Sequence, residues 1–197
     1  MSEIQQSVTD RAPLVSARLK KTVVMVGMMG AGKTAVGRAL AAALAVPFVD
    51  SDHEIEVAAN MSVPEIFARD GEAFFRKRET EVIQRLLEGP ACVLSTGGGA
   101  FMSDQNRRAI TAFGVSVWLD ADVALLWSRV KHRDTRPLLR TDDPRATLEK
   151  LCAERVPAYQ MADLRVPCAP PVAIEIMAQR VIETLMTRPD VLEVHNG

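Results

Sequence analysis

The sequence has little of several features that would narrow its class at once. Its 197 residues include only three cysteines, Cys92, Cys152 and Cys168, which are widely spaced and form no CxxC pair. This spacing argues against a zinc site or a disulfide framework and fits a reducing compartment. The net charge is −1, so we expect no general surface for nucleic acid. The longest apolar run, "ALAAALAVPFV", falls far short of the roughly 20 residues that span a membrane, so we expect no membrane partner.

The two ends of the chain lack the patterns of folded or targeting segments. Residues 1–20 contain no apolar stretch of the kind found in secretory signals, and Glu3 and Asp10 count against a transit peptide. We therefore expect a cytoplasmic monomer with a mobile arm over 1–20. A single domain would cover 21–188, followed by a poorly ordered tail over 189–197.

What the chain does contain is an alternation of short apolar runs with helical periodicity. Five runs are expected to form buried strands, at residues 22–26, 47–50, 92–95, 115–120 and 164–167. Six segments show helical periodicity, at about 34–45, 72–88, 104–112, 121–131, 145–159 and 172–187. Such alternation is typical of parallel βαβ units with helices on both faces of the sheet. The pattern predicts an α/β fold.

Local signals mark two helix starts and one segment without periodicity. In "SVPE", Ser62 and Glu65 have the spacing of a capping box, and in "DDPR" Asp143 and Pro144 suit the N-cap and first helical positions. The segment 131–144 is polar, basic and interrupted by proline. A segment of this kind in a compact domain is either a disordered insertion or a functional lid.

The stretch "GMMGAGKT", residues 27–34, lies between a predicted strand and a predicted helix. It matches the P-loop pattern, Gly-x4-Gly-Lys-Thr, in the structural context that this pattern requires. Glycines let backbone N–H groups surround a phosphate chain at a helix N-terminus. Lys33 can bridge the outer phosphates, and the Thr34 hydroxyl can bind Mg²⁺. A glycine-rich turn without a ligand is the alternative, but the lysine, the hydroxyl and both flanks favour a nucleoside triphosphate site.

Other motifs limit how the nucleotide is used. The chain has no NKxD motif for reading guanine, and residues 92–95 lead into "TGGGA" rather than into acidic residues typical of ATPase motors. The acidic pair, Asp50 and Asp52, instead follows the second predicted strand. If the backbone bends between them, both side chains reach the edge of the sheet where such folds hold ligands. Asp50 would then lie near Mg²⁺ or its waters, and Asp52 near a hydroxyl of the molecule that accepts the phosphoryl group. Capping of the following helix is the alternative role, and the two roles are compatible.

Glycines and arginines complete the candidate set. Gly97–Gly99 ends the third predicted strand, where the backbone can approach a ligand closely, although an ordinary turn is the alternative. Four arginines, Arg76, Arg129, Arg136 and Arg155, offer planar forks for carboxylate or phosphate oxygens. Each one alone is more often a solvated surface residue. Arg136 lies inside the basic segment, so we interpret it as a lid arginine that closes on the transferred phosphoryl group.

These motifs resemble, in order and spacing, those of shikimate kinases. The matching stretches are "GMMGAGKTAVGRALA", "FVDSDHEIE", "IFARDGEAFFRKRE", "LSTGGGA", "RPLL" and "ERVPAY", within about residues 21–168. The resemblance implies a P-loop three-layer α/β/α sandwich with a five-stranded parallel sheet in the order 2-3-1-4-5 and a lid over about 131–144. It also implies transfer of the γ-phosphoryl group of ATP to the 3-hydroxyl of shikimate, with Mg²⁺ as cofactor. This reaction lies on the route to chorismate and the aromatic amino acids.

The family's site residues carry over onto matching positions of this chain. The ATP site would comprise Gly30, Ala31, Gly32, Lys33, Thr34, Ala35, Arg129 and Arg136, with Arg129 against the adenine. Shikimate would be held by Asp52, Arg76, Gly98 and Arg155. Thr34 would bind Mg²⁺ directly, and Asp50 would bind it through water. The catalytic residues would be Lys33, Asp52 and Arg136.

Two other functions stay open at this point. One is another small-molecule P-loop kinase, such as a gluconate kinase, which shares the P-loop and the lid. The other is a non-enzymatic ATP-binding module, which would not need a complete set of acceptor residues. The combination of "DSD", "FR" and "GGG" argues against both.

Overall fold

A five-stranded parallel sheet forms the centre of the molecule. The computed structural model describes residues 17–132, 137–169 and 172–195. The sheet runs β3-β4-β2-β5-β6, with bounds β2 (Thr22–Val26), β3 (Phe48–Asp50), β4 (Val93–Ser95), β5 (Gly114–Ala121) and β6 (Leu164–Cys168). Numbered within the sheet, this order is 2-3-1-4-5, which confirms the predicted topology. All five predicted strands are present.

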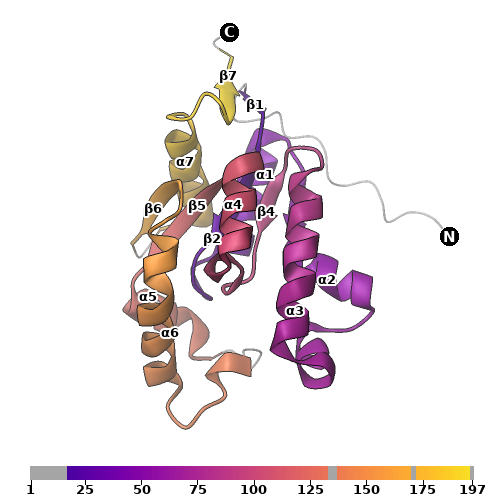
Figure 1. The fold of residues 1–197 in the computed structure, drawn as a ribbon. Coiled ribbons are helices and arrows are strands. Elements are labelled where there is room, and N and C mark those ends of the chain that lie inside the picture. Colours follow the sequence, from indigo (N-terminus) through magenta and orange to yellow (C-terminus); the bar gives the residue numbers. More distant parts are fainter. Residues whose placement is uncertain (1–16, 133–136, 170–171, 196–197) are drawn as a thin grey trace, which may run out of the picture.

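Helices cover both faces of this sheet and give the predicted three layers. They are α1 (Lys33–Leu44), α2 (Ser51–Ala59), α3 (Val63–Leu87), α4 (Asp104–Phe113), α5 (Val123–Val130), α6 (Pro144–Tyr159) and α7 (Ile174–Leu185), with short 3₁₀ turns η1 (Ala100–Met102) and η2 (Pro137–Leu139). On one face α1 packs against α7, and α4 covers the opposite face (Figure 1). Within the described ranges, none of the helices has the length and apolar character needed to cross a membrane.

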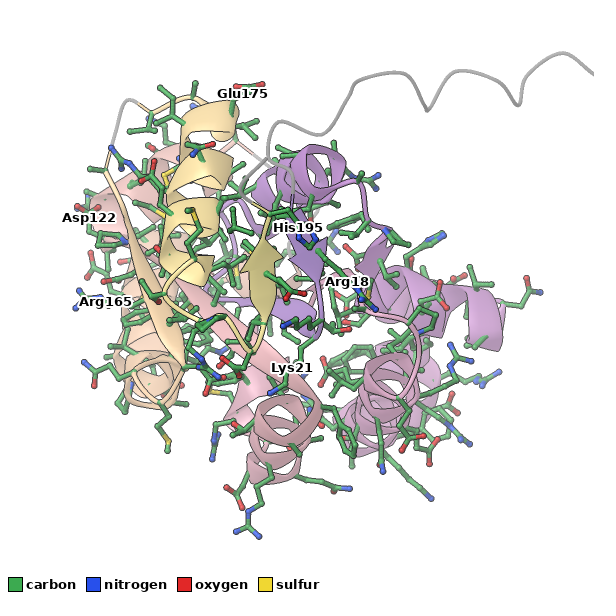
Figure 2. The ribbon with its side chains drawn as sticks, turned by 90° about the horizontal axis from the view of Figure 1, so that it is seen from above. Arg18, Lys21, Asp122, Arg165, Glu175 and His195 are labelled. Atoms are coloured by element: carbon green, nitrogen blue, oxygen red, sulfur yellow. The ribbon has the colours of Figure 1, made fainter. Side chains whose placement is uncertain are left out.

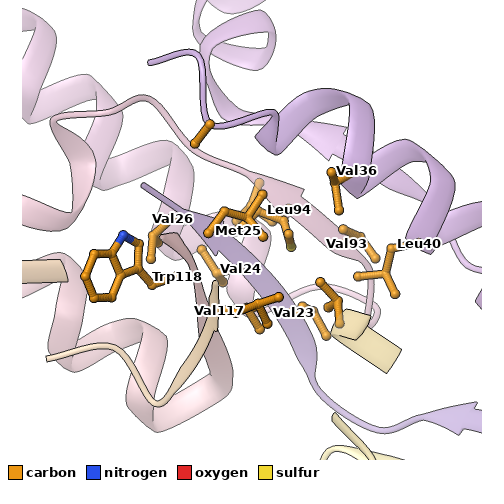
Figure 3. Packing of buried hydrophobic residues seen from close by; sticks show 14 of the residues in the cluster. Val23, Val24, Met25, Val26, Val36, Leu40, Val93, Leu94, Val117 and Trp118 are labelled. Atoms are coloured by element: carbon orange, nitrogen blue, oxygen red, sulfur yellow. The ribbon is translucent and has the colours of Figure 1, made fainter. Parts of the chain in front are cut away.

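The core lies where the central strand β2 meets its neighbours and α1. All five residues of β2 are buried, as expected for a strand covered on both faces. Val36 and Leu40 of α1 lie over this part of the sheet, near Val93 of β4 (Figure 3). This packing fixes the end of β2, and therefore the loop that follows it, against the rest of the sheet.

Two short strands at the ends of the chain were not predicted. β1 (Ala17–Leu19) pairs antiparallel with β7 (Leu192–Val194), with Leu19 opposite Leu192. Both leucines are buried, so the ribbon contributes to the core. Residues 17–19 and 192–194, which fall in the predicted arm and tail, are thus paired strands of the fold.

Both strands escaped prediction because they lie outside the βαβ alternation on which the strand predictions rested, in a separate two-stranded ribbon. They pair only because the fold brings residues 17–19 and 192–194 together. Ion pairs join the segments beside the ribbon, including Lys21 Nζ to Asp190 Oδ2 at 3.1 Å. Hydrogen bonds from Arg188 and Lys21 hold the pKa of the Asp190 carboxyl well below its usual range. Figure 2 views this end of the molecule from above, with Lys21 labelled.

The helices also differ from expectation around residues 51–71. α2 was not among the predicted helices, and α3 begins at Val63 rather than near residue 72. The capping box of Ser62 and Glu65 is present at the start of α3, as its motif predicted. Gly71, with φ 84° and ψ 172°, kinks α3 and divides it where the predicted helix began.

Candidate functional site

The P-loop lies between β2 and α1, as its sequence predicted. Gly32 is the N-cap of α1 and has φ 96°, a left-handed conformation that favours glycine. The helix begins at Lys33, so its first N–H groups and its positive dipole end face the loop. Thr34 follows in the first turn and is exposed. This geometry is that of an anion-binding helix N-terminus.

Two cations are fixed at this loop by hydrogen bonds to its backbone. Lys33 Nζ donates to the carbonyl oxygens of Gly27 at 2.7 Å and Met28 at 3.0 Å. Arg129, from the last turn of α5, donates from Nη1 to the carbonyl oxygens of Gly30 at 3.0 Å and Ala31 at 3.2 Å. Arg129 therefore lies at the P-loop backbone, and its contact with adenine stays a prediction. Both charges are placed to attract phosphates.

Asp50 and Asp52 lie where the chain turns sharply from β3 into α2. Asp50 is the last residue of β3 and caps α2, because its Oδ1 accepts from the backbone N–H groups of Asp52 at 3.0 Å and His53 at 3.3 Å. The strand ends and the helix begins between the two aspartates, which is the bend that the sequence argument required. The capping role belongs to Asp50, and the side chain of Asp52 is left for another use.

Asp52 is a largely buried carboxylate with a raised pKa. Burial is the main cause that raises its pKa to about 6, and the charge of Asp50 adds to the rise while Lys33 opposes it. Its Oδ1 is buried and has no hydrogen-bond partner among the residues that the structure describes. A buried polar atom of this kind is costly unless a ligand satisfies it. Asp52 therefore points to a hydroxyl donor on a bound molecule.

Glu79 is a second buried carboxylate, which the sequence argument missed. Its side chain is 1% exposed, and its Oε2 accepts from Nη1 of Arg76 at 2.8 Å. Burial raises its pKa, and the charge of Arg76 opposes that rise. Its other oxygen, Oε1, is buried without a partner in the described part of the chain. The spacing of Arg76 and Glu79, three residues apart on a helix, was the signal that could have found it.

The glycine run after β4 supports these side chains by lacking side chains of its own. A Cβ at Gly97 would lie 3.0 Å from Asp52 Oδ1 and 3.2 Å from Glu79 Oε1. A Cβ at Gly98 would lie 2.9 Å from Arg155 Nη1. The two glycines therefore let two carboxylates and an arginine close against the backbone.

Gly99, which also lacks a side chain, lets Arg76 approach the backbone in the same way. A Cβ at this position would overlap the guanidinium of Arg76, which approaches the bare backbone from α3. Arg76 and Arg155 thus reach the same three residues from different helices. We call Asp52, Arg76, Glu79, Gly97–Gly99 and Arg155 the acceptor cluster.

One predicted site residue cannot be placed. Arg136 lies outside the described residues, as do the three residues before it, 133–135. The part of the predicted lid that follows contains η2, and α6 begins at Pro144 with Asp143 as its N-cap, as predicted. The lid assignment therefore stays a prediction from the sequence.

The fold and the site together define a class of protein. A P-loop with a fixed lysine lies at the same edge of a parallel sheet as a cluster of two arginines and two buried carboxylates. Charge effects link the two parts, since Lys33 and Arg76 both lower the pKa of Asp52. This arrangement is that of a P-loop kinase whose second site suits a small molecule with an anionic group and hydroxyls.

Comparison with known proteins agrees with this class and narrows it. The family model described as shikimate kinase matches residues 29–186. A shikimate kinase from Ruegeria pomeroyi is 64% identical over 194 residues, which cover 98% of this chain and 100% of the relative. A solved structure of shikimate kinase from Acinetobacter baumannii in complex with shikimate has a TM-score of 0.80 at 38% identity, covering 85% of this chain and 93% of the other. The chain belongs to the shikimate kinase family and is an ATP-dependent kinase.

The alternative of a gluconate kinase has weaker support. A gluconokinase structure from Sinorhizobium meliloti has a TM-score of 0.56 at 17% identity, covering 86% of this chain and 94% of the other. A likeness at that identity shows the common P-loop fold alone. The family match also removes the alternative of a non-enzymatic module.

Proposed function

We propose that this protein transfers the γ-phosphoryl group of ATP to the 3-hydroxyl of shikimate, giving shikimate 3-phosphate and ADP for chorismate and aromatic amino acid synthesis. The observation that carries the proposal is the acceptor cluster. It combines two arginine forks with a buried carboxylate that lacks a partner in the described residues, at the sheet edge that also carries the P-loop. Shikimate has one carboxylate and three ring hydroxyls, which are the complementary groups.

On the acceptor side, each residue of the cluster has a role that follows from its charge. Arg76 and Arg155 bind the shikimate carboxylate, because planar guanidinium groups pair with carboxylates in a bidentate way. Glu79 keeps Arg76 in place through their ion pair. Asp52 accepts a hydrogen bond from the ring hydroxyl that attacks. Gly98 contributes backbone next to Arg155.

On the donor side, the P-loop backbone holds the phosphates. The residues that would do so are Gly30, Ala31, Gly32, Lys33, Thr34 and Ala35, with Arg129 placed beside them. Lys33 neutralises charge that spreads over the transferred group, and most of the catalysis comes from such neutralisation and from positioning. The role of Arg136 as lid arginine rests on the sequence alone, as do the monomeric state and the cytoplasmic location.

The residues present suit Mg²⁺. In the described ranges, no group of three or more His, Cys, Asp or Glu side chains forms a cage for a metal. Mg²⁺ usually binds one or two protein oxygens together with substrate phosphates and water, so a cage is not needed. Thr34 and Asp50 would hold it. Both hydrogen bonds that cap α2 fall on Oδ1 of Asp50, so its Oδ2 takes no part in the cap and can face the ion or its waters. When bound, Mg²⁺ supplies positive charge that neutralises the phosphate oxygens.

The protonation state of Asp52 suits a group that orients the attacking hydroxyl. With a pKa of about 6, its carboxyl is mostly ionised at neutral pH and is a better proton acceptor than an ordinary aspartate. In a loose phosphoryl-transfer transition state the hydroxyl needs orientation first and loses its proton late. Asp52 therefore orients the hydroxyl and can receive its proton as the new bond forms.

The direct test is a product assay. Purified protein is incubated with Mg-ATP and either shikimate or gluconate. The products are then separated, and their molecular masses are measured by mass spectrometry. We expect ADP and shikimate 3-phosphate in equal amounts with shikimate, and no phosphorylated product with gluconate. Phosphorylation of gluconate instead, or ADP formation that does not depend on shikimate, would contradict the proposal.

A second test uses the glycine run. Gly99→Ala places a methyl group in the space of the Arg76 guanidinium, so this arginine must move away from the acceptor. We expect the KM for shikimate to rise by about tenfold or more, because small misplacements of binding groups are costly, while the KM for ATP stays within twofold. Steady-state kinetics with each substrate varied in turn measures both values.

The matched control is Gly89→Ala, beyond the end of α3. A Cβ there makes only an ordinary contact, 3.4 Å from the carbonyl oxygen of Leu86. Its kinetics should equal those of the wild type. Equal KM values for shikimate in the wild type and Gly99→Ala would show that Arg76 does not bind the acceptor from its present position.

A further inference from the structure

Tyr159 is the only tyrosine of the chain and none of the roles above uses it. It ends α6, one helical turn after Arg155, so both side chains project from the same face of that helix. Its side chain is among the largest that are fully buried, with 1% of its surface exposed. A buried phenol needs a partner for its hydroxyl, and the partners here lie in the site.

The hydroxyl of Tyr159 joins three parts of the site. It donates to the carbonyl oxygen of Gly98 at 2.5 Å, which is a short hydrogen bond. The guanidinium of Arg155 interacts with the same hydroxyl. The sulfur of Met28, in the P-loop, lies 3.8 Å away. One side chain thus bonds the acceptor backbone, lies near the phosphate loop and interacts electrostatically with an acceptor arginine.

The ring itself has two aromatic neighbours, so the hydroxyl has a defined position. Its centroid lies 6.5 Å from that of Phe101, just after the glycine run, and 6.1 Å from that of Trp118 in β5. Both neighbouring rings are nearly parallel to it, with interplanar angles of 20° and 25°. Contacts of this kind fix the ring independently of the hydroxyl.

The glycine run, in contrast, has no side chains that could anchor it. Glycine has the largest conformational freedom of any residue, so a run of three would sample several backbone states without an external restraint. The hydrogen bond from Tyr159 restrains the peptide that follows Gly98, and Arg155 lies against Gly98 itself. The same hydroxyl therefore acts on the backbone and on the arginine that would bind the acceptor carboxylate.

We propose that Tyr159 is a positioning residue for the acceptor: its hydroxyl holds the Gly98 peptide and the Arg155 guanidinium in the relative arrangement that binds the shikimate carboxylate. The inference rests on the proposed function. It assigns to Tyr159 no contact with shikimate or with the reacting atoms. Burial raises the pKa of Tyr159 to about 12, so the hydroxyl keeps its proton, and its ability to donate, at physiological pH.

The test variant is Tyr159→Phe, which removes the hydroxyl and keeps the ring packing. Losing a buried hydrogen bond that positions a binding group should raise the KM for shikimate about tenfold. The KM for ATP should stay within twofold, because the hydroxyl meets the P-loop only at the side-chain sulfur of Met28, whereas Lys33 is held by backbone carbonyl oxygens. Kinetics are measured with each substrate varied at saturating levels of the other, together with thermal unfolding of the same samples.

Two further variants separate positioning from stability. Tyr159→Leu removes the ring as well, so its unfolding temperature should fall, and Tyr159→Phe should recover that stability without recovering the shikimate KM. Ser116→Ala removes another buried hydroxyl, which bonds Asp163 Oδ2 at 2.8 Å and lies outside the proposed site. This control should lose stability while keeping both KM values of the wild type.

The possible results are distinct. A shikimate KM in Tyr159→Phe within twofold of the wild type would overturn the inference, as would equal rises for shikimate and ATP, which indicate a general structural effect. Failure of the wild type to phosphorylate shikimate would instead overturn the proposed function itself. A selective rise for shikimate in Tyr159→Phe, absent in Ser116→Ala, supports the inference.

Discussion

Lys33→Ala is expected to lose phosphoryl transfer while the protein stays folded. The Lys33 ammonium is held over the P-loop by two carbonyl oxygens, at 2.7 and 3.0 Å, so it is oriented before the nucleotide arrives. A preorganised charge at the transferred phosphoryl group stabilises the transition state, and removing one such donor costs about 100- to 1,000-fold in rate. A coupled assay for ADP measures this loss, and circular dichroism compares the folds.

The control for this variant is Lys150→Ala. Lys150 lies on α6 with 77% of its side chain exposed and forms only a 3.9 Å surface ion pair with Glu154. Such pairs contribute little to stability, so this variant should turn over like the wild type. Turnover of Lys33→Ala within about tenfold of the wild type would remove Lys33 from the catalytic residues.

Asp52→Asn is expected to lose at least about 100-fold in turnover, because an amide neither accepts the hydroxyl proton nor carries the charge that orients the nucleophile. ATP binding should be retained, because the P-loop backbone and Lys33 remain. Titration with a fluorescent ATP analogue measures the second effect, and the ADP assay measures the first. An equal loss of nucleotide affinity would place Asp52 in the metal site instead of the acceptor cluster.

The same substitution should stabilise the ligand-free protein at neutral pH. The pKa of Asp52 is about 6 in the folded state, above its ordinary value of 3.8, so the folded protein holds this proton more tightly than the unfolded chain. The stability that the protonated carboxyl contributes is therefore complete below about pH 4 and is lost as the pH rises through 6. We expect Asp52→Asn to raise the free energy of unfolding at pH 7 by on the order of 1–3 kcal/mol.

Urea unfolding of the wild type and of Asp52→Asn at pH 4 and pH 7 tests whether the substitution raises the free energy of unfolding. The gain should fall to a small fraction at pH 4, where Asp52 is neutral in the folded state and about half neutral in the unfolded chain. Glu175→Gln, which neutralises an exposed carboxylate on α7, is the control and should show no comparable gain. A destabilised Asp52→Asn at pH 7 would mean that the charge of this residue stabilises the fold, contrary to its burial.

Several elements followed from local sequence, because their causes are local. The strand β2, the P-loop and the start of α1 appeared as an apolar run, a glycine pattern and a helical period within about 25 consecutive residues. The helix caps at Ser62 and Asp143 could also be predicted from local sequence, because a cap involves residues only three apart. The sheet order came from the resemblance, because no local pattern states which strands are neighbours.

The sequence by itself thus determined the class of fold, the phosphate loop and the types of residue available for an acceptor. The resemblance had assigned Asp52, Arg76 and Arg155 to one site, and the tertiary structure shows how these residues, spread over about a hundred positions, converge on Gly97–Gly99. It also decided that Glu79 is buried, that the Tyr159 hydroxyl meets Gly98, and that β1 pairs with β7. The physical reason is common to all of these. Burial, altered pKa values and hydrogen bonds between distant segments arise from packing, and packing has no signal in any short stretch of the chain.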